Sequence, residues 1–214
     1  RRYRYANQPR IALWNLVQLA NALYPLVGRA APLEGALDEY SKTLDEAQRH
    51  MFEHKLGIAS LALADPSSAD KRLVVDLLEL QSASEIDMTI FYRKLADVSA
   101  ERELGGVSDT ALLEPLLPAC YAELTDEQRV RSAGWLRRYL ARVQADGSSD
   151  EARRAQMNRA NPKYVLRNYL AQMAIDQAEA GDPSLIAELL DLLRRPYDEQ
   201  PERERFAARR PDWA

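Results

Sequence analysis

The stretch Asn7–Gly28, NQPRIALWNLVQLANALYPLVG, decides how we expect this chain to fold. Pro9 suits the first turn of a helix, where its missing N–H costs no hydrogen bond, and Gly28 is a typical helix stop. The apolar residues between them recur at helical spacing and leave little polar surface on any side. A helix that is apolar on most sides is normally covered on most sides. The sequence therefore predicts a buried central helix, with Trp14 in the core, around which the other helices pack.

Helical patterns continue through the first half of the chain. Apolar residues recur at threes and fours across Leu33–Leu56, which predicts a long amphipathic helix. A turn follows, in which Ser67 or Ser68 can cap the next helix. Ser84 is expected to cap a further helix over Glu85–Val98. Each of these segments has the length and spacing of a helix.

The second half carries more helix-start signals. Thr125 and Gln128 have the spacing of a capping box. The pair Asn161-Pro162 combines a cap with a proline in the first turn, which predicts a helix running to Gly181. No run alternates polar and β-branched residues cleanly enough to predict a strand. We therefore expect an all-α fold of roughly eight to ten helices.

Composition limits the classes of protein that the chain can represent. Its 214 residues suffice for one domain with a real core or for two small ones. The net charge of −4 does not favour a nucleic-acid partner, and no apolar run reaches the length of a membrane span. A single cysteine, Cys120, rules out an internal disulfide and suits a reducing compartment. The start at Arg1, without Met, agrees with a truncated product or a piece of a longer protein.

One short pattern is typical of a metal site. His50, Glu53 and His54 form HxxEH, in which the two histidines of inverzincin metalloproteases bind zinc and the glutamate acts as base. A third ligand would be needed, and Glu123 or Glu127 could supply it. Three fixed positions are weak evidence, however, and the inverzincin fold is mixed α/β. We interpret the histidines as surface or partly packed residues and Glu53 as part of a solvated helix face.

Cys120 and the basic residues allow both a functional and a structural interpretation. Cys120 could be a nucleophile, but its neighbours favour packing as a small apolar side chain. Several basic and aromatic residues near the chain start could contact phosphates, although solvated or paired arginines are the simpler interpretation; they are Arg1, Arg2, Tyr3, Arg4, Tyr5 and Arg10. The same interpretation applies to Trp135 with Arg137-Arg138, and to Arg153-Arg154.

A third polar group belongs to the helix expected after Asn161. Lys163, Arg167, Asn168 and Gln172 share its polar side and could line an interface. A solvated face is the simpler alternative on the pattern alone.

Several long stretches resemble one known family. The segment NPKYVLRNYLAQMAIDQAEAGD at 161–182 closely resembles the C-terminal part of the selenoprotein O (SelO) family, as do LLDLLRRPYDEQP and the terminal RPDWA. NQPRIALWNLVQLANALYPL resembles the segment that follows the family's kinase-like active site. KLGI, LVVDLLELQ and IDMTIFYRKL fit its middle helices. The resemblance covers essentially the whole chain, in order.

This resemblance implies a protein adenylyltransferase with a kinase-like (pseudokinase) fold. Such an enzyme binds ATP in a flipped pose and transfers AMP to Ser, Thr or Tyr hydroxyls of proteins, with magnesium or manganese. The family's glycine-rich loop, Lys–Glu pair, Asp-Asn catalytic loop and DYGP-like metal Asp do not occur in this chain. The resemblance therefore assigns no catalytic, cofactor-binding or metal residue here, and we expect this part alone to be inactive and to hold neither ATP nor a metal.

The resemblance also implies an organisation and partners. Residues 1–28 would be the central helix continuing the kinase-like C-lobe, and residues 29–214 a helical C-terminal region forming one compact unit with it. The expected partners are the upstream catalytic lobe and protein substrates, without nucleic acid or membrane. The compartment would be the cytoplasm of a bacterium or the mitochondrion of a eukaryote. The alternative function is a non-enzymatic helical module that binds a protein through the polar face of 161–180.

Overall fold

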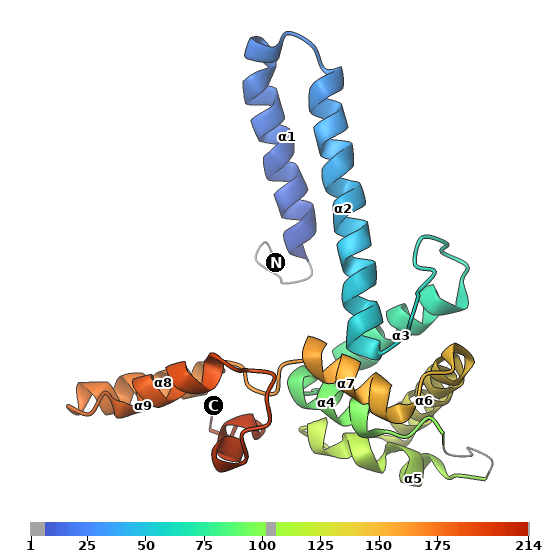
Figure 1. Cartoon of the computed structure of the whole chain (residues 1–214), viewed down its shortest axis with the longest axis vertical. Coiled ribbons are helices and arrows are strands. Elements are labelled where there is room, and N and C mark those ends of the chain that lie inside the picture. The colour runs from blue at the N-terminus through green and yellow to red at the C-terminus, as the bar shows by residue number, and fades with distance from the viewer. Residues whose placement is uncertain (1–6, 102–105, 214) are drawn as a thin grey trace. The chain divides into compact units, whose positions relative to one another are not determined.

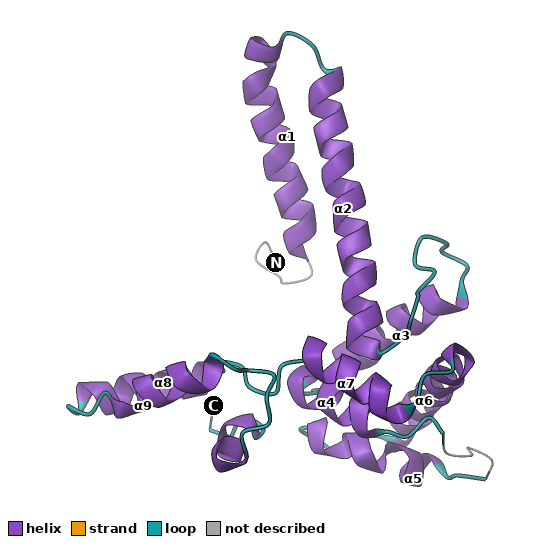
Figure 2. Cartoon of the chain, in the orientation of Figure 1, coloured by secondary structure: helices purple, strands orange, loops and turns teal. Residues whose placement is uncertain are grey.

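The computed structural model describes residues 7–101 and 106–213, and this part of the chain is helical without any strand (Figure 1, Figure 2). The prediction of an all-α fold is confirmed. The elements are α1 (Gln8–Val27), α2 (Ala31–Leu56), α3 (Ala69–Ala83), α4 (Met88–Asp97), α5 (Asp109–Leu113), η2 (Glu114–Ala119), α6 (Asp126–Asp146), α7 (Asp150–Ala160), α8 (Asn168–Glu179), α9 (Ser184–Leu193) and η3 (Pro201–Ala207). No helix of the described residues has both the length and the apolar character needed to cross a bilayer.

Contacts between residues divide the chain into two units. The first unit ends at Met51 and the second begins at Phe52, so the boundary falls inside α2. The two units are described separately below. The assignment of residues 1–28 and 29–214 to two functional parts stays a prediction.

The first unit is a helical hairpin of α1 and the greater part of α2 (Figure 1). Pro9 lies in the first turn of α1, and Gly28 ends the helix in a left-handed conformation with φ 72°. The Tyr40 hydroxyl on α2 donates a hydrogen bond to the Pro9 carbonyl at 3.3 Å. Both predicted ends of the first helix are therefore confirmed.

The predicted burial of this first helix is wrong for the described chain. No residue of α1 is buried, and the exposed fractions of Trp14 and Leu26 are 53 % and 84 %. Within the hairpin α1 has one neighbouring helix, and a single neighbour covers only one side of a helix. The apolar character of α1 therefore does not come from a core inside this unit.

The core lies in the second unit, where α3 to α7 and the end of α2 enclose a large apolar cluster. Trp135 on α6 is 2 % exposed, stacks on Tyr139 with ring centroids 5.4 Å apart, and donates its indole N–H to the Leu73 carbonyl at 2.9 Å. The helix that carries both rings begins at the predicted capping box, in which Thr125 and Gln128 bond each other's backbone N–H. This cap sets where α6 begins and which of its residues face the core.

A second, smaller cluster follows in sequence. It consists of Tyr164, Leu170, Ala174, Leu185, Leu189, Leu192 and Phe206. The residues come from α8, α9 and η3, with Tyr164 in the segment before α8. The paired helices α8 and α9 thus have a core of their own.

Two predicted caps are wrong. Asn161 does not start a helix: α8 begins at Asn168, and Asn161 instead ends α7, where its side-chain amide donates to the carbonyls of Met157 and Lys55 at 2.9 and 3.0 Å. Ser84 likewise follows the end of α3 rather than starting α4. The cap of α4 is Asp87, whose carboxylate accepts from the backbone N–H of Ile90 at 3.1 Å.

Among the glycines that the structure describes, Gly57 should be the least replaceable. Its φ is +63°, and a Cβ built on it would lie 2.6 Å from Cγ of Arg153 and 2.9 Å from Cγ of Met157, both buried side chains. We expect Gly57→Ala to lower the free energy of unfolding by about 2–3 kcal/mol, from left-handed strain plus overpacking. Gly147→Ala is the matched control, because Gly147 has φ +71° with no atom within 4 Å of the built Cβ. Equal losses in urea denaturation of the two variants would contradict the overpacking.

Candidate functional site

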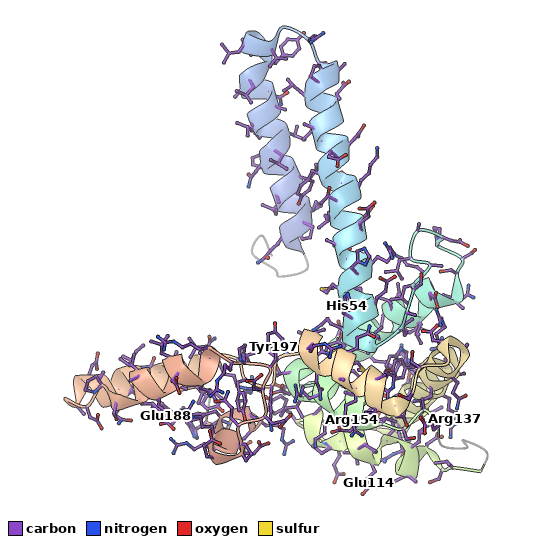
Figure 3. All side chains as sticks on the ribbon, viewed as in Figure 1. His54, Glu114, Arg137, Arg154, Glu188 and Tyr197 are labelled. Atoms are coloured by element: carbon purple, nitrogen blue, oxygen red, sulfur yellow. The ribbon has the colours of Figure 1, made fainter. Side chains whose placement is uncertain are left out.

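The HxxEH residues do not form a metal site in the described structure. His50 and His54 are exposed, as predicted (Figure 3 shows His54 on α2), but Glu53 is only 5 % exposed and accepts a hydrogen bond from the Leu61 backbone N–H at 2.9 Å. The prediction that Glu53 belongs to a solvated face is therefore wrong. Glu123 and Glu127 are exposed, and residues 7–101 and 106–213 contain no group of three or more His, Cys, Asp or Glu able to hold a metal.

Cys120 has a structural environment. It is half-buried at the end of η2, and its carbonyl accepts a hydrogen bond from the Arg209 guanidinium. Burial raises the pKa of the Cys120 thiol, although the charge of Arg209 opposes this. A raised pKa keeps the sulfur protonated and a poor nucleophile, which agrees with packing rather than catalysis.

The basic residues of the sequence have different surroundings. Residues 1–6 lie outside the described part of the chain. Arg137 pairs with Asp109 at 2.6 Å and Arg138 with Asp76 at 2.7 Å, as the structural interpretation predicted. Figure 3 shows Arg137 on α6. Partly exposed ion pairs of this kind contribute little to stability, so nothing in these contacts indicates a functional role for the two arginines.

Arg153 is buried and not solvated, although it pairs with an acidic neighbour, as the structural interpretation allowed. Its side chain is 1 % exposed, whereas the Arg154 side chain beside it is 51 % exposed. The Arg153 guanidinium donates to the carbonyl of Val98 and to the Tyr139 hydroxyl, and it lies 3.3 Å from the Asp150 carboxylate. A cation at the last carbonyls of α4 is favourable both as a hydrogen-bond donor and to the helix dipole.

Asp87, Tyr121 and Arg167 form a well connected polar group, which we call the Asp87 cluster. Arg167 donates two hydrogen bonds to the Asp87 carboxylate and the Tyr121 hydroxyl donates a third at 3.1 Å. Burial alone would raise the pKa of Asp87, but the bonds from Arg167 and from the Ile90 N–H outweigh it and hold that pKa below its usual range. Arg167 thus forms an ion pair inside the chain, and its guanidinium does not lie on the polar interface that the sequence offered as one interpretation.

A cavity of about 510 Å³ lies along α4 within the second unit; we call it the α4 cavity. Lys163 lines it and bridges Glu199 and Glu204 at 2.6 Å each, while Arg93 also pairs with Glu199. Burial alone would lower the pKa of Lys163, but its two carboxylate partners outweigh burial and raise it. Lys163 therefore stays charged. It lies in the segment before α8 and so is not on the helix face that the sequence predicted.

The remaining two residues of the predicted polar face are solvated. Asn168 and Gln172 are exposed, and Gln172 donates to Asp176 one turn later at 2.7 Å. Sequence reasoning missed Asp87, Arg93 and Glu199. Arg93 and Glu199 are 106 residues apart and have no local signal, whereas Asp87 caps α4 and could have been found as a helix-start residue.

Comparison with known proteins gives one consistent result. Residues 1–194 match the family model described as protein adenylyltransferase SelO. Three similar relatives are each named protein nucleotidyltransferase YdiU: those of Rhodopirellula baltica, Aromatoleum aromaticum and Xanthomonas campestris are 49 %, 47 % and 46 % identical. The alignments cover 100 % of this chain but 40 %, 39 % and 39 % of the respective relatives. The chain thus spans about 40 % of the length of the curated relatives it matches.

Proposed function

This chain belongs to the protein adenylyltransferase SelO family, and we propose that it is the helical C-terminal portion of an enzyme that transfers AMP from ATP to Ser, Thr or Tyr hydroxyls of proteins. In that reaction the hydroxyl oxygen attacks the α-phosphorus, its proton passes to a base, and the bond to the departing pyrophosphate breaks. Magnesium or manganese bound with ATP would neutralise the charge that develops on the polyphosphate.

The proposal places the reacting groups outside this sequence. The family's glycine-rich loop, Lys–Glu pair and metal-binding Asp are absent from the 214 residues, and the chain covers about 40 % of its relatives' length. We therefore assign no catalytic residue to it. Its role is to support the kinase-like catalytic lobe that the rest of the protein would form.

The observation that carries this role is the uncovered surface of α1. Trp14, Leu19 and Leu26 are 53 %, 54 % and 84 % exposed on a helix with no buried residue. An apolar helix surface of this kind marks an interaction site, and covering it with the catalytic lobe would be favourable by about 25 cal/mol per Å² of apolar area. The catalytic lobe is the proposed occupant of this surface.

The first experiment uses ATP labelled on the α-phosphate beside ATP labelled on the γ-phosphate, with the whole protein and with this chain. We expect the whole protein to transfer α-label to protein and this chain to transfer none. Transfer of γ-label would indicate an ordinary kinase, and α-label transferred by this chain would reveal a site in these residues. No transfer by either would favour the non-enzymatic interaction module.

A variant on α1 tests the supporting role separately. Leu19→Asp in the whole protein should reduce α-label transfer at least tenfold, which corresponds to about 1.4 kcal/mol, because the new charge would be buried against the catalytic lobe. The same change in this chain should leave the melting temperature nearly unaltered, since Leu19 is exposed there. Gln48→Asp on an exposed position of α2 is the control. If the two whole-protein variants are equally active, the α1 surface is not covered.

A further inference from the structure

The α4 cavity has the size and position of a small-molecule site. Its volume of about 510 Å³ lies in the usual range for such sites. One face of α4, from Thr89 to Asp97, forms a wall, and the segment from Glu204 to Arg209 contributes another. At a rise of about 1.5 Å per residue, the α4 wall is roughly 12 Å long. An elongated ligand therefore suits the cavity better than a single small ion.

Two of the four cations in the cavity wall are not neutralised. Arg93 and Lys163 are paired with Glu199. Lys94 and Arg209 also line the cavity, and neither has a carboxylate within ion-pair distance among the residues that the structure describes. Arg209 donates to a neutral acceptor, the carbonyl of Cys120. Three carboxylates, those of Asp97, Glu199 and Glu204, also line the cavity, so its lining has a net charge of +1 in a chain whose net charge is −4.

These two charges lie at different points along the cavity. Arg209 is fixed near the N-terminal end of α4, because its partner Cys120 forms a bridge with Ile86 just before that helix. Lys94 lies six residues after Met88, the first residue of α4, which is a rise of about 9 Å along the helix; flexible side chains can shorten this separation. Thr89 lies on α4 before Lys94 and lines the same cavity. A ligand with two linked anionic groups can meet both cations at once.

We propose that the α4 cavity binds a small molecule carrying a diphosphate group. A diphosphate offers several acceptor oxygens to the arginine fork and to the lysine point charge, with the Thr89 hydroxyl as a further donor. Ile90, Pro118 and Ala207 form an apolar part of the wall that fits an uncharged substituent on the diphosphate. The site is distinct from the proposed AMP transfer, since it consists of residues of this chain alone, and either proposal can fail without the other.

The experiment is isothermal titration of this 214-residue chain, which contains none of the family's ATP-binding motifs, with inorganic pyrophosphate and with ADP. We expect both to bind at least tenfold more tightly than orthophosphate, and binding to weaken as salt is added. Lys94→Gln and Arg209→Gln should each weaken pyrophosphate binding at least fivefold. Lys42→Gln on α2, an exposed lysine of the first unit, removes the same charge outside the cavity and should have no effect.

Three results would overturn the proposal. No heat of binding at millimolar pyrophosphate would show that the cavity takes no diphosphate. Equal weakening by Lys94→Gln and Lys42→Gln would show attraction to net charge only. Citrate binding as tightly as pyrophosphate would assign the cavity to polycarboxylates instead. Thr89→Val, which changes no charge, gives a second test at the site, with an expected loss of about threefold for one hydrogen bond; circular dichroism verifies that each variant is folded.

Discussion

Replacing Trp135 with alanine is expected to lower the free energy of unfolding of this chain by about 3–5 kcal/mol, the usual loss for a large aromatic core residue. The indole is 2 % exposed, stacks on Tyr139, and donates to the Leu73 carbonyl. The variant would therefore lose apolar contacts and leave a carbonyl between α3 and α6 without its donor. Trp14→Ala is the matched control and should cost less than about 1 kcal/mol here, because Trp14 is 53 % exposed.

Urea denaturation followed by far-ultraviolet circular dichroism compares the two tryptophan variants. Hydrogen exchange should show faster exchange of α6 amides in Trp135→Ala only. Similar losses for both variants would mean that α1 is buried in this chain in solution. In the whole protein the cost of Trp14→Ala should rise, because the proposed catalytic lobe would then cover that ring.

Arg153→Met is expected to lower the free energy of unfolding by about 2–4 kcal/mol, because it leaves two buried acceptors of the guanidinium without that donor and removes a partly exposed ion pair. The Arg153 side chain is 1 % exposed and pairs with Asp150 at 3.3 Å. Its guanidinium also donates to Val98 and Tyr139, which methionine cannot replace. The variant would leave a carboxylate, a carbonyl and a hydroxyl without a charged donor at the C-terminal end of α4.

Arg154→Met is the control for this second prediction. Arg154 follows in the chain, but its side chain and that of its partner Asp97 are each 51 % exposed, at 3.3 Å from one another. Exposed pairs contribute roughly 0–1 kcal/mol, so the melting temperature should hardly change. A melting temperature of Arg153→Met as high as that of Arg154→Met would show that the buried guanidinium is dispensable.

Local signals predicted the helices well. Thr125 with Gln128, and Ser68 before α3, cap the helices that their sequences indicated, because the bonded groups lie three residues apart. Asn161 and Ser84 have the same local chemistry but do not start helices. The side chain of Asn161 instead bonds the Met157 carbonyl at the end of α7 and accepts a hydrogen bond from Lys55, 106 residues earlier. Tertiary partners thus decided which of the possible caps form.

Hydropathy predicted the character of α1 but not its surroundings. An apolar periodic pattern shows that a helix needs cover, whereas it does not show whether the same stretch of chain supplies that cover. Trp14 and Leu26 are therefore exposed within the first unit, although the pattern predicted a buried helix. If the proposed catalytic lobe covers α1 in the whole protein, the apolar pattern of this helix and its exposure in this chain have the same explanation.

The polar clusters could not be predicted from sequence. Asp87 and Arg167 are 80 residues apart, and no spacing rule links them. Arg153 and Arg154 look alike in sequence, yet one is buried and the other solvated, since successive residues point to different sides of a helix. Only the packing of α7 against the end of α4 distinguishes them.

The two apolar clusters of the second unit have a consequence for how the protein is made. The larger cluster uses residues from Leu56 to Met157, and the smaller one uses residues from Tyr164 to Phe206. Neither interrupts the other along the chain, and domains that are continuous in sequence fold as units while synthesis proceeds. The larger core can therefore close once Met157 has left the ribosome, before the last fifty or so residues emerge, so the order of synthesis separates the closing of the two cores.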